Sequence, residues 1–161
     1  MHWTWTCFED LGVHGLYDIL ALRCRVFVLE QGAYLDPDGF DACSWHLQGR
    51  DAQGVLQAYL RAVHPGRKYD EPSIGRVAVA PELRGSGLGR ALMREGLARC
   101  AAQWPGRGVR ISAQARLRRF YRELGFVPLG DEYPEDGIPH LQMLHGPADA
   151  GANPGEPRCT S

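Results

Sequence analysis

The spacing of hydrophobic residues predicts a strand and then a helix at the start of the chain. Trp3, Trp5 and Cys7 alternate with threonines, a period of two that is typical of a strand over residues 2–8. From residue 16 the apolar positions recur at intervals of three and four, as on one face of a helix. This pattern predicts an amphipathic helix over residues 16–31.

The middle of the chain has the pattern of a hairpin followed by a further strand. Residues 44–50 and 55–64 alternate in hydrophobicity, and Asp51-Ala-Gln-Gly54 between them has the composition of a tight turn. After a polar loop, another strand is expected over residues 73–80.

The segment before this hairpin, residues 32–43, is expected to be a loop. Its acidic stretch, Asp36-Pro-Asp38-Gly-Phe-Asp41, resembles part of a calcium-binding loop. A calcium loop needs an acidic residue where this chain has Phe40, and it needs a closing glutamate that this chain lacks. We therefore interpret the stretch as a solvated turn and expect no metal site.

Helices and strands alternate in the second half of the chain. An apolar stripe that includes Leu92 and Trp104 predicts a long helix, and a shorter helix is expected to end at Gly125, a residue that commonly caps helices. The helices are predicted over residues 88–104 and 117–124, and the strands over residues 109–113, 126–129 and 138–144.

Length and composition indicate one globular domain. Of 161 residues, 44% are hydrophobic and 23% are charged, close to ordinary values for folded domains. We expect the domain to span residues 1–145 and the Gly-, Pro- and Ala-rich residues 146–161 to form a disordered tail. Neither a membrane span nor a secretory signal is recognisable, so a cytoplasmic protein with no membrane partner is expected.

The cysteines and the net charge argue against two further classes. Five cysteines without Cys-x-x-Cys spacing indicate neither a disulfide framework nor a zinc site. Lys and Arg number 18 against 19 Asp and Glu, a formal charge of -1, without the basic excess of a nucleic-acid binder. The arginine-rich residues 116–122 keep nucleic-acid binding as a rival that predicts salt-sensitive retention of DNA or RNA. We expect no nucleic-acid partner and interpret these arginines as a solvated helix face.

The most informative stretch is a glycine-rich turn, Arg84-Gly-Ser-Gly87-Leu-Gly89, between a predicted strand and a predicted helix. Glycines let the backbone turn sharply and approach an anion, and the free N–H groups of a helix start favour negative charge. The turn lacks the lysine of a Walker loop, and Arg90 stands where a dinucleotide-binding turn has its third glycine. The residues indicate a phosphate site of another kind.

Two signatures in this order resemble those of the GNAT superfamily of N-acetyltransferases. The glycine-rich turn resembles its Arg/Gln-x-x-Gly-x-Gly/Ala signature, and Phe120-Tyr121-Arg-Glu-Leu-Gly125-Phe126 resembles its second, aromatic signature. Other stretches are similar to the ElaA-like branch over about residues 3–145: Leu22-Arg23-Cys-Arg-Val26-Phe27-Val-Leu-Glu30-Gln31, Asp38-Gly39, His46, Ile74-Gly-Arg76-Val77, Gln114-Ala115 and Glu135-Asp-Gly-Ile-Pro-His140.

The resemblance implies a mixed α/β (α+β) fold in which helices flank a central, mostly antiparallel sheet that splays between its fourth and fifth strands. It implies acetyl-CoA as acyl donor and direct transfer of the acetyl group to an amine. The pantetheine would pair with main-chain groups in the splayed gap, where the Val79 N–H supports the thioester carbonyl. The implied cofactor contacts are Val77, Ala78, Val79, Arg84, Gly85, Ser86, Gly87, Leu88, Gly89 and Arg90.

Acetyl transfer needs a base, because an alkylammonium keeps its proton up to about pH 10, and an acid for the departing thiolate. Tyr121, placed like the family tyrosine, is the candidate acid. Four titratable residues in segments near the acceptor side are candidate bases: Glu30, His46, Glu132 and His140. His46 and His140 are further expected to be paired across neighbouring strands. A chain of water molecules is the alternative to all four.

Three questions stay open at this point. A GNAT domain that binds acyl-CoA as a sensor without turnover is the alternative to an enzyme, although the complete turn and Tyr121 favour the enzyme. The acceptor remains open among polyamines, amino sugars, antibiotics, amino acids and protein amines. A homodimer is possible, and nothing in the sequence decides it.

Overall fold

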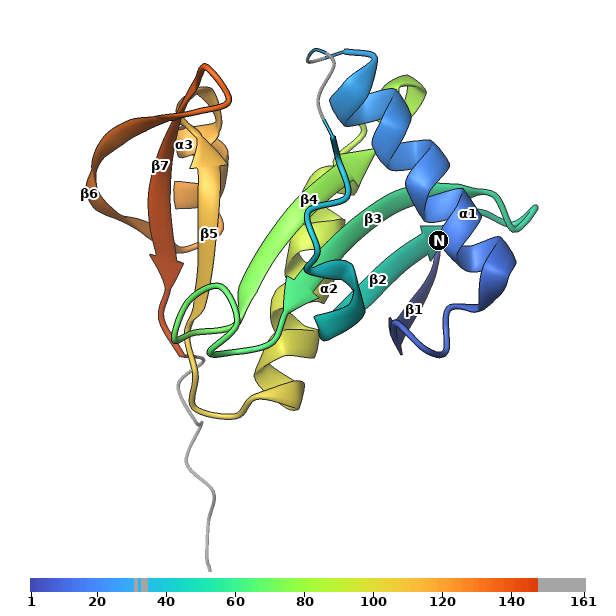
Figure 1. Ribbon diagram of the computed structural model, residues 1–161, viewed down its shortest axis with the longest axis horizontal. Helices are drawn as coiled ribbons and strands as arrows, with labels where there is room; N and C mark the ends of the chain where they lie inside the picture. The colour runs from blue at the N-terminus through green and yellow to red at the C-terminus, as the bar shows by residue number, and fades with distance from the viewer. Residues whose placement is uncertain (31, 33–34, 148–161) are drawn as a thin grey trace, which may run out of the picture.

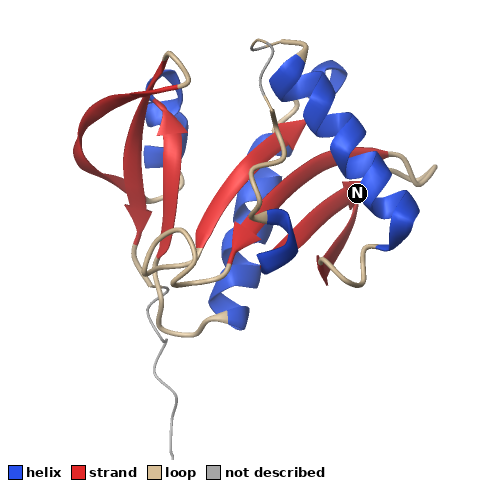
Figure 2. Ribbon diagram, in the orientation of Figure 1, coloured by secondary structure: helices blue, strands red, loops and turns tan. Residues whose placement is uncertain are grey.

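The computed structural model describes residues 1–30, 32 and 35–147. Most of the expected tail, residues 148–161, lies outside them. Within the described residues one sheet of seven strands has the order β1-β2-β3-β4-β5-β7-β6 (Figures 1 and 2). Neighbouring strands are antiparallel except β4 and β5. The strands are β1 (His2–Cys7), β2 (Ser44–Arg50), β3 (Leu56–Val63), β4 (Ser73–Val79), β5 (Val109–Gln114), β6 (Phe126–Glu135) and β7 (Ile138–His145).

Helices cover the two faces of this sheet unequally (Figure 1). On one face α2 and α3 pack over the main core, and on the other α1 packs over a smaller core. Among the described residues no helix is long and apolar enough to cross a membrane. The helices are α1 (Gly12–Arg23), α2 (Leu88–Gln103) and α3 (Arg118–Arg122), with a π-helical turn η1 (Cys24–Val28) and 3-10 turns η2 (Asp41–Cys43), η3 (Pro81–Leu83) and η4 (Ala115–Leu117).

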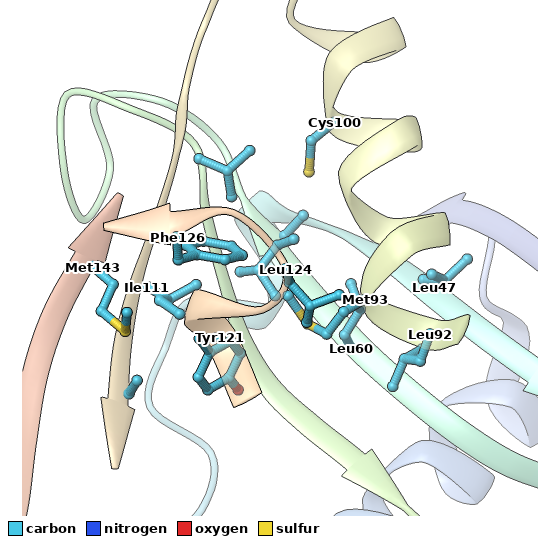
Figure 3. Packing of buried hydrophobic residues seen from close by; sticks show 14 of the residues in the cluster. Leu47, Leu60, Leu92, Met93, Cys100, Ile111, Tyr121, Leu124, Phe126 and Met143 are labelled. Atoms are coloured by element: carbon cyan, nitrogen blue, oxygen red, sulfur yellow. The ribbon is translucent and has the colours of Figure 1, made fainter. Parts of the chain in front are cut away.

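The main core follows from the alternation of side chains along the strands. Leu60 of β3 and Ile111 of β5 point to the α2 and α3 side, where they meet Leu92, Met93 and other apolar side chains (Figure 3). These residues are almost fully buried, and complete burial of such a side chain contributes about 1.5–3 kcal/mol. The burial of these apolar side chains therefore holds the sheet and its two helices on this side together.

The predicted elements occur in the predicted order, and three differ in extent. The first helix begins at Gly12 and ends as the π-helical turn. The short helix before Gly125 is a 3-10 turn followed by α3. Strand β6 runs to Glu135 because it arches past a register shift between Leu129 and Tyr133, where Gly130 has a φ of +71°.

The interpretation of the acidic stretch as a solvated turn is wrong, because buried arginines bind its carboxylates. Arg23 donates from Nε to Asp36 at 2.8 Å and from Nη1 to Asp41 at 2.6 Å. Arg61 donates from Nη1 to Asp41 at 2.8 Å and from Nη2 to Asp38 at 2.7 Å. Burial alone would raise the pKa of Asp38, but hydrogen bonds and charge from Arg61 lower it well below its ordinary value. The stretch is a structural ion-pair network.

A third arginine joins this network to β4. Arg76 lies 2.8 Å from Asp36 through Nε and 3.1 Å from Asp38 through Nη2. Its φ of +52° is unusual for a side chain other than glycine, and the pairing of β4 with β3 shifts register beside it. The network thus holds a bulge in β4, the strand that borders the site described next. We call Arg23, Arg61, Arg76, Asp36, Asp38 and Asp41 the arginine–aspartate network.

Candidate active site

A gap opens in the middle of the sheet, between β4 and β5. The two strands share a single paired position, Ser73 with Arg110, where the Arg110 N–H donates to the Pro72 carbonyl at 2.9 Å. Toward their C-terminal ends they diverge (Figure 1). The expected splay between the fourth and fifth strands is confirmed. Most main-chain groups on the β5 side of β4 therefore have no strand to pair with.

The exposed edge of β4 presents main-chain N–H groups to this gap. The Ala80 N–H donates to the Gln57 carbonyl of the β3 side at 2.8 Å. Because successive N–H groups of a strand point to opposite sides, the Val79 N–H points into the gap. The Val77 and Val79 side chains are half-buried against the main core, while Ala78 is buried on the α1 side. The side chains of these valines therefore pack in the core, whether or not their main-chain groups bind a ligand.

The glycine-rich turn lies at the C-terminal end of β4 and leads into α2. Gly85 and Gly87 have φ angles of +78° and +88°, which other residues rarely adopt. Within the described chain the N–H groups of Gly85, Gly87 and Gly89 make no hydrogen bond. Ser86 braces the turn by donating from Oγ to the Leu83 carbonyl at 2.6 Å, and Leu88 begins the helix. Free donors at a helix start form a site suited to a phosphate.

The two arginines of the turn are held by carboxylates. Arg84 donates to both carboxylate oxygens of Glu30, at 2.8 and 3.1 Å. Arg90 pairs with Glu123, and its guanidinium lies 5.6 Å from the centre of the Phe120 ring. Glu30, expected as a base candidate, therefore lies at the phosphate turn with both oxygens bound to Arg84.

Tyr121 is buried between the sheet and α3 with its hydroxyl at the gap. Its ring packs edge-on against Phe120 and Phe126, and 7% of the residue is exposed. In Figure 3 the hydroxyl points away from Phe126, toward the side where β4 and β5 diverge. Burial raises the pKa of Tyr121 to about 12, so the phenol carries its proton at neutral pH. The described residues provide no hydrogen-bond partner for the hydroxyl, which leaves it free to donate to a ligand.

His46 is a structural residue, and its expected pairing with His140 is wrong. His46 lies on β2, which β3, β4 and β5 separate from β7. It is fully buried, with Nε2 donating to the Asp41 carbonyl at 3.0 Å and Nδ1 accepting from the Tyr59 hydroxyl at 2.8 Å. Burial lowers the pKa of His46, so the ring is neutral with no free lone pair. We do not retain it as a base.

His140 lies on β7, opposite Gln114 of β5, the strand that borders the gap. Its Nδ1 lies 2.8 Å from the Ile138 carbonyl. Since a carbonyl only accepts, Nδ1 carries a proton, and in the neutral ring the lone pair is on Nε2. Ser73 of β4 pairs with Arg110 of β5, so counted four residues further along each strand, Val77 is at the level of Gln114. Gln114 pairs with His140, which by this count places His140 at the same level along the sheet as Val77. Glu132, the remaining candidate, is exposed and paired with Arg118 at 3.0 Å.

The sequence did not predict that the C-terminal strands have a polar face. Along β5 the residues Val109, Ile111 and Ala113 are buried, whereas Ser112 between them faces the opposite side, which α3 does not cover. There it meets Tyr133 and Glu135, which reach across from β6. The alternation of apolar and polar residues along β5 indicated that Ser112 faces away from the core. Nothing comparable in the sequence indicated that β6 arches and brings Tyr133 to Ser112.

The arginines of α3 are exposed, as expected for a solvated helix face, and they border a hollow of about 500 Å³ lined by Arg118, Arg119, Arg122 and Glu123. Glu123 also holds Arg90 in the first turn of α2, so the hollow adjoins the phosphate turn. In residues 1–30, 32 and 35–147 we find no group of three or more His, Cys, Asp or Glu side chains arranged to hold a metal.

A family model described as "Acetyltransferase (GNAT) domain" matches residues 57–145. A UPF0039 protein of Synechocystis is 43% identical over 145 residues, which cover 89% of this chain and 94% of that protein. Protein ElaA of Escherichia coli is 41% identical over 138 residues, 84% of this chain and 90% of that protein.

Solved structures of related proteins are similar to this chain in both fold and sequence. An acyl-CoA N-acyltransferase from Pseudomonas aeruginosa has a TM-score of 0.85 at 39% identity and covers 90% of this chain and 99% of its own. Escherichia coli ElaA has a TM-score of 0.83 at 39% identity, over 89% of this chain and 98% of its own.

Proposed function

Because this chain belongs to the GNAT acetyltransferase family, in its ElaA-like branch, we propose that it is an enzyme that transfers an acetyl group from acetyl-CoA to a primary amine. The observation that carries this proposal is the gap between β4 and β5, which joins an unpaired strand edge to the glycine-rich turn. One ligand that has both an amide-rich arm and a pyrophosphate fits these two features together.

The cofactor contacts follow from the free donors of this site. The pyrophosphate binds the N–H groups of Gly85, Gly87 and Gly89, and Arg84 and Arg90 supply positive charge. The pantetheine arm pairs with the edge of β4, whose Val79 N–H supports the thioester oxygen as it gains charge. The arginine-lined hollow beside Glu123 is the place for the 3'-phosphate end of the cofactor.

The chemical step needs three proton transfers. His140 Nε2 accepts a proton from the ammonium form of the acceptor, directly or through water, and the free amine then attacks the thioester carbonyl carbon. As the tetrahedral intermediate collapses, the C–S bond breaks and the sulfur takes a proton from the Tyr121 hydroxyl, while the nitrogen of the new amide gives up its surplus proton, through water, to the resulting phenolate. Supporting this assignment, His140 has a free lone pair and Tyr121 is protonated at neutral pH.

A thiol-release assay with acetyl-CoA and a panel of small amines and peptides tests the proposal. The expected result is release of CoA that depends on both the protein and an amine. Acetyl-CoA binding without release for any amine would contradict the enzyme and favour the acyl-CoA sensor. Absence of acetyl-CoA binding would contradict both.

A further inference from the structure

One carboxylate on the β5 side of the gap, that of Glu135 in β6, has hydroxyl groups as partners in place of a cation. Glu135 Oε2 accepts a hydrogen bond from Ser112 Oγ at 2.6 Å and lies 3.4 Å from the Tyr133 hydroxyl. The Tyr133 hydroxyl and Ser112 Oγ are 2.6 Å apart. Tyr133 therefore donates to Ser112, which donates to Glu135. In the described part of the chain Glu135 Oε1 makes no hydrogen bond, so one oxygen is free to bind a ligand.

This arrangement differs from that of the other carboxylates with similar burial. Among described residues, no Arg, Lys or His nitrogen lies within 4 Å of the Glu135 carboxylate. Asp51, which also lacks a cation, sits in the β2–β3 turn and accepts main-chain N–H groups of Gln53 and Val55. The other half-buried or buried carboxylates all form ion pairs with arginine: Asp18, Asp36, Asp41, Glu71 and Glu95.

The unpaired carboxylate lies next to the proposed base. Tyr133 is directly opposite His140 in the pairing of β6 with β7, and their ring centres are 6.4 Å apart. Glu135 follows Tyr133 by two residues and therefore faces the same side of the strand. A ligand held by Glu135 would thus lie on the face of the sheet opposite α3, on the same side as the proposed base and next to the β3–β4 loop.

From this geometry we propose that Glu135 binds a second positive charge of the acceptor, so that the preferred substrates are aliphatic amines with two or more ammonium groups. The Ser112 and Tyr133 hydroxyls fix the orientation of the carboxylate, and its free oxygen forms a charge-assisted hydrogen bond with the ammonium that is not acetylated. The transfer to the other ammonium rests on the proposed function, whereas binding of the dication does not.

Lys68 is the internal competitor for this carboxylate, because the negative charge of Glu135 acts on its ammonium group. It comes from the β3–β4 loop, its Nζ lies 5.5 Å from the centre of the Tyr69 ring, and it makes no ion pair within the described residues. If Lys68 satisfied Glu135 in solution, the carboxylate would be a structural group. A Lys68→Met variant separates the two roles.

Calorimetry on the protein saturated with CoA tests the proposal, with 1,4-diaminobutane and 1-aminobutane as probes. The expected result is that the diamine binds at least tenfold more tightly than the monoamine, and that Glu135→Gln removes this preference without changing the affinity for CoA. Lys68→Met is expected to retain the preference. Equal binding of both probes by the unmodified protein, or a preference that survives in Glu135→Gln or disappears in Lys68→Met, would overturn it.

Circular dichroism shows whether Glu135→Gln is folded. If it is not, a second variant tests the same proposal. Ser112→Ala removes the hydroxyl that orients Glu135 and is expected to reduce the preference for the diamine at least threefold; an unchanged preference would count against the proposal.

Thiol release separates the dication site from the proposed enzyme activity. Diamine preference without release from any amine would contradict the enzyme alone, and release with no preference would contradict the dication site alone.

Discussion

Two polar clusters lie on the same face of the sheet, on opposite sides of the gap, and they differ in how their charges are used. In the arginine–aspartate network each carboxylate meets guanidinium groups at close range. In the cluster of Ser112, Tyr133, Glu135 and His140, hydroxyls and a carbonyl are the partners. Within residues 1–30, 32 and 35–147, a carboxylate oxygen and an imidazole nitrogen of this cluster remain free. The comparison teaches that the first cluster stabilises the fold and the second is available to a ligand.

The largest effect is expected from breaking the network. Arg61→Met leaves Asp38 and Asp41 without their shared cation, and removing one partner of a buried ion pair costs about 3–5 kcal/mol. Urea unfolding should show this loss. The matched control is Arg119→Met, which breaks an exposed pair with Glu123 and should change stability by less than about 1 kcal/mol. Similar small losses in both variants would contradict the structural role of the network.

On the other side of the gap, a substitution should change the rate of acetyl transfer and leave the stability of the fold nearly unchanged. Tyr121→Phe removes the proposed proton donor and should lower kcat by about 100-fold or more, with little change in the affinity for acetyl-CoA because the hydroxyl acts on the departing sulfur. Steady-state kinetics with calorimetry of acetyl-CoA measures both. Tyr17→Phe, on an exposed part of α1, is the control. Unchanged kcat in Tyr121→Phe would remove Tyr121 from the mechanism.

The network should also make stability sensitive to acid. The pKa of Asp38 and of Asp41 is below the ordinary value in the folded protein, because their bonds to arginine outweigh the opposing effect of burial. Their stabilising contribution is complete above the unfolded pKa of about 4 and is lost as pH falls through the folded values, with a slope of at most about 1.4 kcal/mol per pH unit for each group.

Urea titrations from pH 6 to pH 2 measure this slope. The Asp38→Asn variant should be less stable at pH 6 and show a shallower decline below pH 4. A slope unchanged by the substitution would show that other carboxylates cause the acid sensitivity.

The smallest effect is expected at the phosphate turn. Gly87→Ala places a side chain at a φ of +88°, which costs about 1 kcal/mol, and it should weaken acetyl-CoA binding because the turn relaxes. Gly15→Ala, in the interior of α1, has the ordinary helical conformation and contacts only the Leu11 side chain, so it should leave stability equal or higher by up to about 1 kcal/mol. Thermal unfolding and calorimetry of both variants make the comparison. Equal stability and affinity in Gly87→Ala would contradict the role of this conformation.

The sequence predicted the fold well because its strands and helices have clear periods, and because the turn around Gly87 has a definite physical chemistry. It failed where the partners are distant along the chain. Asp36, Asp38 and Asp41 resembled a solvated turn because their arginines come from α1, β3 and β4. Ser112 and Glu135 meet only because β6 arches, and His46 and His140 are distinguished by their place in the sheet, their burial and their partners.

The central claim is that the unpaired edge of β4 and the glycine-rich turn bind one molecule of acetyl-CoA, and amide hydrogen exchange tests it most directly. Exchange followed by NMR with and without acetyl-CoA should show new protection of the Val79 amide together with those of Gly85 and Gly87, while Ala80, already bonded to β3, changes little. Binding of acetyl-CoA without protection at Val79 and the turn, or no binding, would contradict the account.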